Sequence, residues 1–406
     1  PRPKPSVPAA PLKSGADFHL LKAMRHVALA VSGGSDSIGL LRLAAAWAQS
    51  QSNAPRISVL TVDHGLRHTS ADEAGQVAAW AAALGLAHYT LVWSGPKPGT
   101  GIQSKARTAR YDLMTGWCRA NGAEALLTAH TLDDQAETVL MRLERTKSPA
   151  SLSAIPAVGQ WDGTVLLRPL LDMKRETLRD HLRQIGQGWI EDPSNRDPRF
   201  ERVRVRQHLV ELAPLGVTTD RLSALSRAAA VTDGLLEKCS MQWLSLWLQE
   251  DDAGVCYAPL DVLEGLPQPL QQRILSRIII HYGGGRMRPE AAELARLCHW
   301  LLDGNGPRCT LAGAVIGRRR TQFWVTREAS RIDATPLVLH QGHEIIWDGR
   351  FAISGPEGAI VTPAGTSGAV LDHDVPVYAR RAYPVISTVG AEPGAINLRF
   401  LRLQRP

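Results

Sequence analysis

The chain has 406 residues, of which 44% are apolar and 21% are charged, so it is long enough for two or three domains with buried cores. No apolar run reaches the roughly 18 residues that span a membrane, and the Pro-rich start lacks the apolar segment of a signal peptide; both features predict a soluble, cytoplasmic protein without a membrane partner. The net charge of +7 favours a polyanionic partner but does not identify it.

The N-terminal half alternates between short apolar runs and helical patterns. Residues 1–22 are rich in proline and small side chains and lack periodicity, which predicts a flexible tail. Ser70 followed by Glu73 forms a capping-box pattern at the start of one helix. Strands alternating with helices predict an α/β fold, a doubly wound parallel sheet that binds ligands at the carboxyl ends of its strands. The predicted strands cover residues 26–31, 57–62, 88–93 and 125–129, and the predicted helices cover residues 36–50, 70–84 and 103–121 and begin again near Asp133.

A short polar loop follows the first strand and opens the next helix. Its glycines allow a tight turn whose N–H groups point at one anion, and its hydroxyls add donors. A polyphosphate would repel Asp36 unless a divalent cation lay between them, so we expect Asp36 to bind Mg²⁺. The loop matches neither a Walker A motif nor a dinucleotide fingerprint, and an ordinary Gly/Ser turn is the simpler alternative. The loop residues are Ser32, Gly33, Gly34, Ser35, Asp36 and Ser37.

Further polar residues follow the second and fourth predicted strands. Asp63 and His64 follow the second strand, and His130, Asp134 and Glu137 follow the fourth. Each group alone could cap a turn or complement a helix N-terminus, but their position at strand ends beside a phosphate loop favours one binding site. Asp134 and Glu137 are three residues apart on one helical face, where paired carboxylates could hold a metal ion or an ammonium group.

The phosphate loop resembles the PP-loop of the N-type ATP pyrophosphatases, which split ATP between the α- and β-phosphates. Further segments within residues 26–210 resemble, in order, the motifs of the tRNA(Ile)-lysidine synthetases; they cover residues 62–67, 106–111, 128–138 and 191–206. The resemblance implies a two-step reaction on the wobble cytidine of a tRNA(Ile) with a CAU anticodon. ATP adenylates the C2 oxygen of the base and releases pyrophosphate, and free L-lysine then attacks C2, expels AMP and leaves lysidine.

The resemblance also implies roles for single residues. The loop would bind the ATP phosphates, with Asp36 on Mg²⁺. Arg107 and His130 match positions near the reaction centre and could stabilise charge on the α-phosphate. The ε-amine of lysine must lose a proton before it attacks, so one of the acidic residues could also act as general base, and the sequence does not indicate which. The carboxylates expected to bind the lysine ammonium group are Asp63, Asp134 and Glu137.

Two departures from the family pattern leave alternatives open. Gln103 stands where the family usually carries Glu, and residues 142–148 lack the glycines of the usual Arg-Gly-Ser-Gly segment. The second departure keeps a non-catalytic tRNA-binding homologue as an alternative. A PP-loop tRNA thiolase is the enzymatic alternative, but it should carry a cysteine pair, and the five cysteines of this chain form no C-x-x-C pair.

The remaining sequence predicts a catalytic domain at residues 23–215, a helical or α+β tRNA-binding domain at 216–335 and a small β-rich domain at 336–406. Helical patterns cover residues 218–250, 269–282 and 289–302, and short strands flank a basic turn at 317–320. We expect one group of arginines on an extended segment and another in that turn to contact tRNA phosphates, although three adjacent arginines can equally form a solvated turn. The sequence leaves the oligomeric state open, a homodimer included. The expected tRNA-binding residues are Arg202, Arg204, Arg206, Arg318, Arg319 and Arg320.

Overall fold

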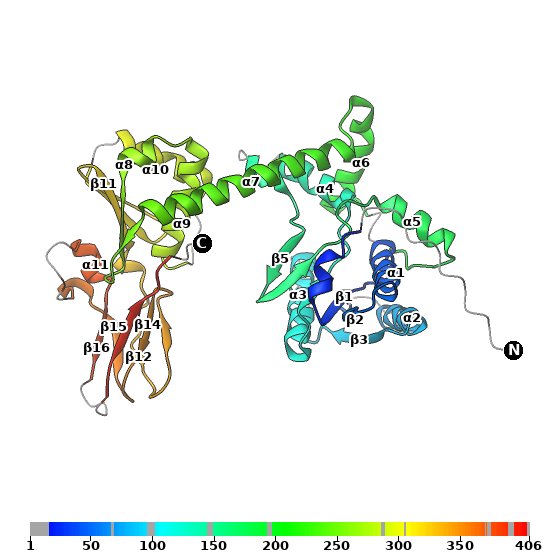
Figure 1. The fold of residues 1–406 in the computed structure, drawn as a ribbon, viewed down its shortest axis with the longest axis horizontal. Helices are drawn as coiled ribbons and strands as arrows, with labels where there is room; N and C mark the ends of the chain where they lie inside the picture. Colours follow the sequence, from blue (N-terminus) through cyan, green and yellow to red (C-terminus); the bar gives the residue numbers. More distant parts are fainter. Residues whose placement is uncertain are drawn as a thin grey trace. The chain divides into compact units, whose positions relative to one another are not determined.

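The structure, a computed structural model, forms two compact units, Pro1–Val231 and Thr232–Pro406, and the chain passes from one to the other within helix α7, Thr219–Trp247 (Figure 1). Part of the expected tail is ordered, because His19–Ala23 form the 3-10 helix η1 and Leu21 is buried, and residues 1–15 lie outside the described residues. The expected domain boundaries at residues 215 and 335 stay predictions. The described residues are 16–65, 69–95, 102–143, 149–192, 197–285, 289–303, 306–369, 371, 375–388 and 394–403.

The first unit contains a six-stranded sheet in the order β3-β2-β1-β4-β6-β5. The five strands from β3 to β6 are parallel, and β5 pairs antiparallel with β6 at the edge. The parallel arrangement confirms the α/β fold expected from the alternating pattern. The strands are β1 His26–Ala30, β2 Arg56–Asp63, β3 Ala87–Val92, β4 Ala125–Leu127, β5 Val158–Trp161 and β6 Thr164–Leu167.

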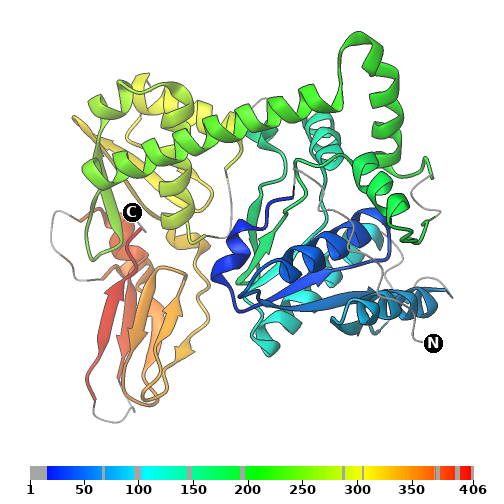
Figure 2. The ribbon, with the colours of Figure 1, turned by 45° about the vertical axis from the view of Figure 1, so that its right-hand side comes forward.

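Both faces of this sheet are covered, because successive residues of β1 belong to different cores. Val27 and Leu29 pack with residues of α1, α2 and α5, whereas Ala28 packs with residues of α3. Figure 1 shows α3 on the side of the sheet opposite α1 and α2, and Figure 2 shows α1, in dark blue, in front of the strands. The helices of this unit are α1 Ser35–Gln49, α2 Ser70–Ala83, α3 Ile102–Asn121, α4 Leu132–Leu143, α5 Arg175–Gln184 and α6 Glu201–Leu212, with the 3-10 helices η2 Pro149–Ser153 and η4 Ala213–Leu215.

The capping box expected at Ser70 is wrong by one residue. Helix α2 begins at Ser70, and Thr69 is its N-cap. The Thr69 hydroxyl donates to Glu73 Oε1 at 2.9 Å, and the Glu73 N–H donates to the Thr69 carbonyl at 2.9 Å. The Glu73 side chain therefore fixes the start of α2 through Thr69, the residue that precedes the helix.

The second unit contains a five-stranded antiparallel sheet in the order β7-β8-β11-β10-β9. One face packs on helices, since Phe323 and Val325 of β11 share a core with Ile274 and Ile278 of α9. Trp324 alternates with these residues and belongs to the other face. The strands are β7 Gln249–Glu250, β8 Val255–Pro259, β9 Arg308–Leu311, β10 Ala314–Arg319 and β11 Gln322–Arg327, and the helices are α8 Leu260–Glu264, α9 Gln268–Tyr282 and α10 Ala291–Asp303.

Two small antiparallel sheets complete the second unit and confirm its β-rich C-terminal part. Trp347, Phe351 and Phe400 from this part share one core with Ile278 and Tyr282 of α9. The β-rich part therefore folds against the helices of the same unit. Its elements are η5 Ala329–Arg331, β12 Leu337–Val338, β13 Ile345–Trp347, β14 Phe351–Ser354, β15 Ile360–Pro363, η6 Gly365–Ser367, α11 Val377–Arg381, β16 Pro384–Ser387 and β17 Asn397–Phe400.

A buried ion pair joins these parts of the second unit. Asp348 Oδ2 accepts from the Nε atoms of Arg327 and Arg350, each at 2.9 Å, and the three side chains are 4%, 3% and 1% exposed. Burial lowers the pKa of Arg350 to about 10, although Asp348 opposes the shift. One carboxylate therefore compensates two buried guanidinium groups.

We expect Asp348→Asn to destabilise the second unit by about 3–5 kcal/mol, because the substitution leaves two buried positive charges without their counter-charge. The asparagine itself fits the positive φ of 47° at this position. Chemical denaturation followed by circular dichroism measures the change. Asp252→Asn, which removes an exposed pair with Arg402, is the matched control and should change stability by less than about 0.5 kcal/mol. Equal effects of the two substitutions would contradict the prediction.

Candidate active site

The polar loop between β1 and α1 has the tight geometry that the sequence predicts. Gly33 has φ +89°, and a Cβ atom there would lie 2.5 Å from Ile190 Cδ1, so the position requires glycine. The Ser37 hydroxyl donates to the Gly34 carbonyl at 2.9 Å and accepts from the Ser32 N–H at 3.2 Å. Helix α1 begins at Ser35, within this segment, so its positive N-terminal end adds to an anion site there.

Three carboxylates meet around the guanidinium of Arg175, the first residue of α5. Arg175 Nε donates to Asp36 Oδ2 at 2.9 Å, and its two other nitrogens lie 3.3 Å from Asp134 Oδ1 and from Glu137 Oε1. The backbone N–H of Arg175 donates to Asp133 Oδ2 at 2.7 Å, which fixes the start of α5 against α4. We call Asp36, Asp134 and Glu137 the carboxylate cluster. The cluster unites the residue expected on Mg²⁺ with two residues expected on lysine.

Sequence reasoning missed Arg175 and its neighbour Arg179. Arg179 lies one turn further along α5, and its Nε donates to Ser35 Oγ of the phosphate loop at 3.3 Å. The place of α5 in the chain could have pointed to these arginines. Helix α5 follows β6, which pairs parallel with β4, so α5 also begins at the carboxyl edge of the sheet. Helix α5 therefore presents two arginines to the site.

The arginines after residue 200 lie on helix α6, so the expected extended segment is wrong. Arg202 and Arg206 are four residues apart on one helical face and point at the cluster. Arg206 Nε donates to Glu137 Oε1 at 2.5 Å, and Arg202 Nη1 lies 3.9 Å from Asp134 Oδ1. Arg204 points elsewhere and donates to the carbonyls of Pro198 and Arg199 at 2.9 and 3.0 Å.

Burial and these arginines set the charge state of the cluster. Burial raises the pKa of Asp36, although the charge and hydrogen bond of Arg175 oppose the shift. Burial acts in the same direction on Asp134, but three effects outweigh it and lower the pKa of Asp134. They are the charge of Arg175, the charge that His130 carries at the acidic pH where Asp134 titrates, and two bonds from Thr131, both 2.8 Å. The carboxylates outweigh burial at Arg175 and raise its pKa, so this guanidinium is always charged.

His130 is a neutral imidazole at physiological pH. Burial lowers the pKa of His130 to about 4, and the charges of Arg168, Arg107 and Arg202 add to the shift, while Asp134 opposes it. Thr128 Oγ1 lies 2.9 Å from His130 Nδ1 and orients the ring. The Arg107 guanidinium stacks 5.1 Å from the centroid of the Tyr111 ring on α3. His130 can therefore act as a hydrogen-bond donor, and Arg107 supplies the positive charge.

Asp63 lies at the carboxyl end of β2, where its side chain shapes the following turn. Its Oδ1 accepts from the Gly65 N–H at 2.8 Å. The His64 ring lies edge-on to Trp93 with centroids 6.0 Å apart. A role of Asp63 in lysine binding stays a prediction. Residues 144–148 of the altered segment, residues 66–67 and residues 193–196 lie outside the described residues.

The basic segment of the second unit is mostly strand, so the expected three-arginine turn is wrong. Arg318 and Arg319 end β10, and Arg320, with φ 54°, begins the connection to β11. Arg319 pairs with Gln322 across this hairpin. Arg318 Nη1 donates to the Trp300 carbonyl at 3.4 Å, whereas Arg319 and Arg320 line a pocket of the same unit.

All five cysteines are free, and burial raises the pKa of Cys118 to about 11. None of the helices in the described part of the chain is long and apolar enough to cross a membrane.

Known proteins of one family are similar to this chain over most of its length. A family model described as a PP-loop domain matches residues 12–213. The tRNA(Ile)-lysidine synthase of Ruegeria pomeroyi is 37% identical over 82% of this chain and 77% of its own length. The corresponding proteins of Rhizobium meliloti and Rhodopseudomonas palustris are 35% and 41% identical over 91% and 73% of this chain, and 83% and 88% of their own lengths. The structure of a tRNA thiolase from Methanococcus maripaludis matches with 16% identity and a TM-score of 0.45 over 53% of this chain and 75% of its own, which is too distant to support an inference. The chain therefore belongs to the tRNA(Ile)-lysidine synthase family of ATP-using PP-loop enzymes.

Proposed function

We propose that this protein attaches free L-lysine to C2 of the wobble cytidine in a tRNA(Ile) with a CAU anticodon. In the first step the C2 oxygen attacks the α-phosphorus of ATP and pyrophosphate leaves. In the second step the ε-amine of lysine attacks C2, the C2–O bond breaks, and AMP leaves with that oxygen. One observation carries the proposal: Asp36 of the phosphate loop and two acidic residues of α4 meet around one guanidinium, so the expected ATP site and the expected amine site would share one wall.

The phosphate loop and α1 would bind the ATP phosphates. Gly33 lets the backbone approach the anion, and Arg179 lies beside Ser35 where it can pair with a phosphate oxygen. Carboxylate oxygens suit Mg²⁺, which proteins usually bind through one or two carboxylates plus substrate phosphates. When bound, Mg²⁺ would neutralise the phosphate oxygens.

Arg107 and His130 would act at the α-phosphate of ATP. Negative charge grows on the phosphate oxygens as the C2 oxygen attacks, and a positioned donor stabilises it. His130 is neutral because its pKa lies at about 4, so its ring N–H would donate a hydrogen bond without adding charge. Arg107 on α3 would provide the cation.

Glu137 and Asp134 differ in how many close hydrogen bonds their oxygens already accept. Glu137 is 1% exposed and its Oε1 accepts from Arg206 at 2.5 Å and from Arg175 at 3.3 Å. Asp134 Oδ2 accepts two bonds from Thr131, whereas the contacts of Asp134 Oδ1 with the described arginines are longer, at 3.3 and 3.9 Å. Glu137 Oε2 also accepts from Arg206 Nη2 at 3.3 Å, but the Asp134 side chain is 9% exposed and that of Glu137 only 1%. Asp134 Oδ1 is therefore the oxygen of this pair that a lysine ammonium group could best reach, and Glu137 would orient Arg206.

We expect Asp134→Asn to raise the KM for lysine by roughly 10- to 100-fold, the value of one charge-assisted hydrogen bond, while the KM for ATP changes much less. Steady-state lysidine formation at varied lysine and varied ATP measures both constants. Asp172→Asn removes an exposed carboxylate paired with Arg227 and serves as the control. Parallel rises in both constants would instead assign Asp134 to the metal.

The proposed function is tested by mixing the full chain with ATP, Mg²⁺, L-lysine and a transcript of tRNA(Ile) with a CAU anticodon. We expect lysidine in the digested RNA, and no product when lysine or ATP is left out. Pyrophosphate release without lysidine would point to another nucleophile. Tight tRNA binding without any pyrophosphate release would favour the non-catalytic homologue that the altered segment at 142–148 suggests.

A further inference from the structure

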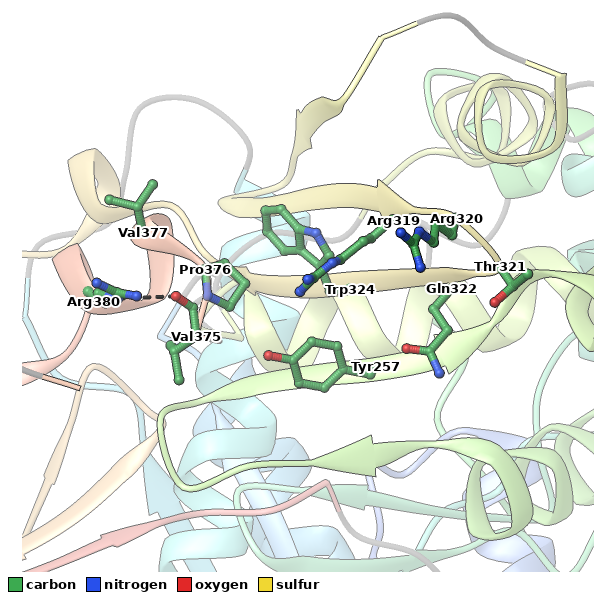
Figure 3. Close-up of a pocket in the computed structure, with 10 residues that line it drawn as sticks. All are labelled: Tyr257, Arg319, Arg320, Thr321, Gln322, Trp324, Val375, Pro376, Val377 and Arg380. Carbon is green, nitrogen blue, oxygen red and sulfur yellow. Dashed lines mark hydrogen bonds between the residues drawn. The ribbon is translucent and has the colours of Figure 1, made fainter. Parts of the chain in front are cut away.

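A pocket of about 550 Å³ lies in the second unit, far along the chain from the carboxylate cluster. Strand β8, the β10–β11 hairpin and the segment from Val375 to Arg380 form its walls. Figure 3 shows Tyr257 and Trp324 on neighbouring strands, with Arg320 on the right of this aromatic pair and Arg380 on the left. None of the described residues that line it is acidic.

Strand pairing places the aromatic side chains of the pocket in one row across the sheet. Trp324 of β11 is the partner of Tyr257 on β8 and of Gly317 on β10, and Gly317 is the partner of Arg308 on β9. A Cβ atom on Gly317 would collide with the indole, so the Trp324 ring lies against the bare backbone of its neighbour. This row is on the face of the sheet opposite Phe323 and the helices.

Contacts with neighbouring side chains hold the two aromatic rings of the pocket in place. The Tyr378 ring of α11 is nearly parallel to Trp324, with centroids 6.1 Å apart and an angle of 15° between the planes. The Arg308 guanidinium lies 4.6 Å from the Tyr378 centroid. The Tyr257 hydroxyl donates to Asp251 Oδ2 at 3.4 Å, which orients the phenol ring. Aromatic and guanidinium planes of this kind stack on nucleobases.

Arginines at the rim supply the complementary charge for a phosphate backbone. Arg319 and Arg320 line the pocket and form no ion pair with any residue that the structure describes. Arg380 Nε donates to the Val375 carbonyl at 3.1 Å, so the charged end of Arg380 is fixed at the other side of the pocket. Guanidinium groups bind phosphate oxygens in bidentate geometry. The chain as a whole carries a net charge of +7, which also favours a polyanion.

We infer that this pocket captures an unpaired nucleotide of the tRNA, stacking its base in the aromatic row of Tyr257 and Trp324 and holding its phosphates on Arg319 and Arg320. The inference rests on the proposed function for the identity of the RNA. It assigns the pocket to single-stranded RNA, because a base inside a duplex has no free face for an aromatic ring. A free mononucleotide and a duplex are the competing occupants.

The test measures equilibrium binding of the full chain to the CAU tRNA transcript, to a single-stranded oligonucleotide, to a blunt RNA duplex and to free ATP. We expect Trp324→Ala to weaken binding of the tRNA and the oligonucleotide by roughly 5- to 100-fold, with little change for the duplex. Trp324→Phe keeps a stacking ring and should restore most of the affinity. Trp247→Ala removes a tryptophan that is 43% exposed outside the pocket, and it should leave binding and activity unchanged.

Variants of the two rim arginines measure the phosphate contacts independently of base stacking. Replacing Arg319 and Arg320 by glutamine should weaken tRNA binding and lower the slope of log affinity against log salt by about one unit for each phosphate that is no longer bound. The Trp324 variants should leave this slope unchanged. Circular dichroism of each variant separates lost binding from lost folding.

Three outcomes would overturn the inference. A folded Trp324→Ala protein could bind tRNA as tightly as wild type does, or it could lose equal affinity for the duplex and for the single strand. The third outcome is that it loses affinity for free ATP alone. Failure of the proposed function is distinguishable, because binding is measured without turnover. Wild-type protein that forms no lysidine but loses RNA affinity in Trp324→Ala would reject the activity and keep the pocket. Lysidine formation together with unchanged RNA affinity of that variant would reject the pocket alone.

Discussion

Asp36→Ala should lower Mg²⁺-dependent pyrophosphate release by at least about 100- to 1,000-fold, since a bound metal ion contributes several kcal/mol to transition-state stabilisation. Binding of tRNA should stay nearly intact, because the arginines proposed to hold RNA belong to other elements. Single-turnover pyrophosphate release at varied Mg²⁺, with tRNA binding measured in parallel, checks both parts. Asp36→Asn should retain the hydrogen bond from Arg175 and still lose the reaction, because a neutral amide is a poor Mg²⁺ ligand.

Asp172→Asn is again the matched control, because it removes an exposed carboxylate from the same unit. Wild-type rates for Asp36→Ala at every Mg²⁺ concentration would remove Asp36 from the metal site. A defect that high Mg²⁺ rescues in Asp36→Asn would support the assignment further, since weakened metal binding is overcome by mass action.

The sequence predicted the elements that depend on local pattern. Strand β1 faces two cores and is therefore apolar along its length, and the loop turns at positive φ and therefore contains Gly33. Both patterns can be recognised from neighbouring residues alone. The carboxyl-edge rule then placed His130, Asp134 and Glu137 beside the loop without any knowledge of contacts. These three predictions needed only the order of strands and helices.

The errors arise where distant contacts decide the outcome. Residues 202–206 alternate arginine and valine, a period of two that is typical of a strand. The structure forms a helix there, in which Arg202 and Arg206 face the acidic residues of α4 while Val203 and Val205 are buried. Arg175 was missed for a related reason: its partner Asp36 is 139 residues away, and no local pattern distinguishes it from an ordinary basic residue at a helix start.

Arg175→Gln should disable the enzyme by at least about 100-fold and destabilise the first unit by about 3–5 kcal/mol at neutral pH, because two buried carboxylates and the partly buried Asp36 lose their shared counter-charge. The guanidinium is 16% exposed and sits between the carboxylates that would bind Mg²⁺ and lysine. Those ligands must therefore bind beside Arg175 or displace it. Denaturant unfolding and single-turnover pyrophosphate release measure the two losses.

The pH and Mg²⁺ dependence of this variant identify the cause. Asp134 has a pKa below its ordinary value of 3.8 in the folded protein, so its contribution to stability is present above that value and is lost as the pH falls. The stability difference between wild type and Arg175→Gln should therefore shrink on acidification below about pH 4. Mg²⁺ should raise the melting temperature of Arg175→Gln more than that of wild type, because the cation can take the place of the missing guanidinium among the carboxylates. A Mg²⁺ response equal to that of wild type would mean that Arg175 does not compete with the metal, and the guanidinium would then be a purely structural link between α1, α4 and α5.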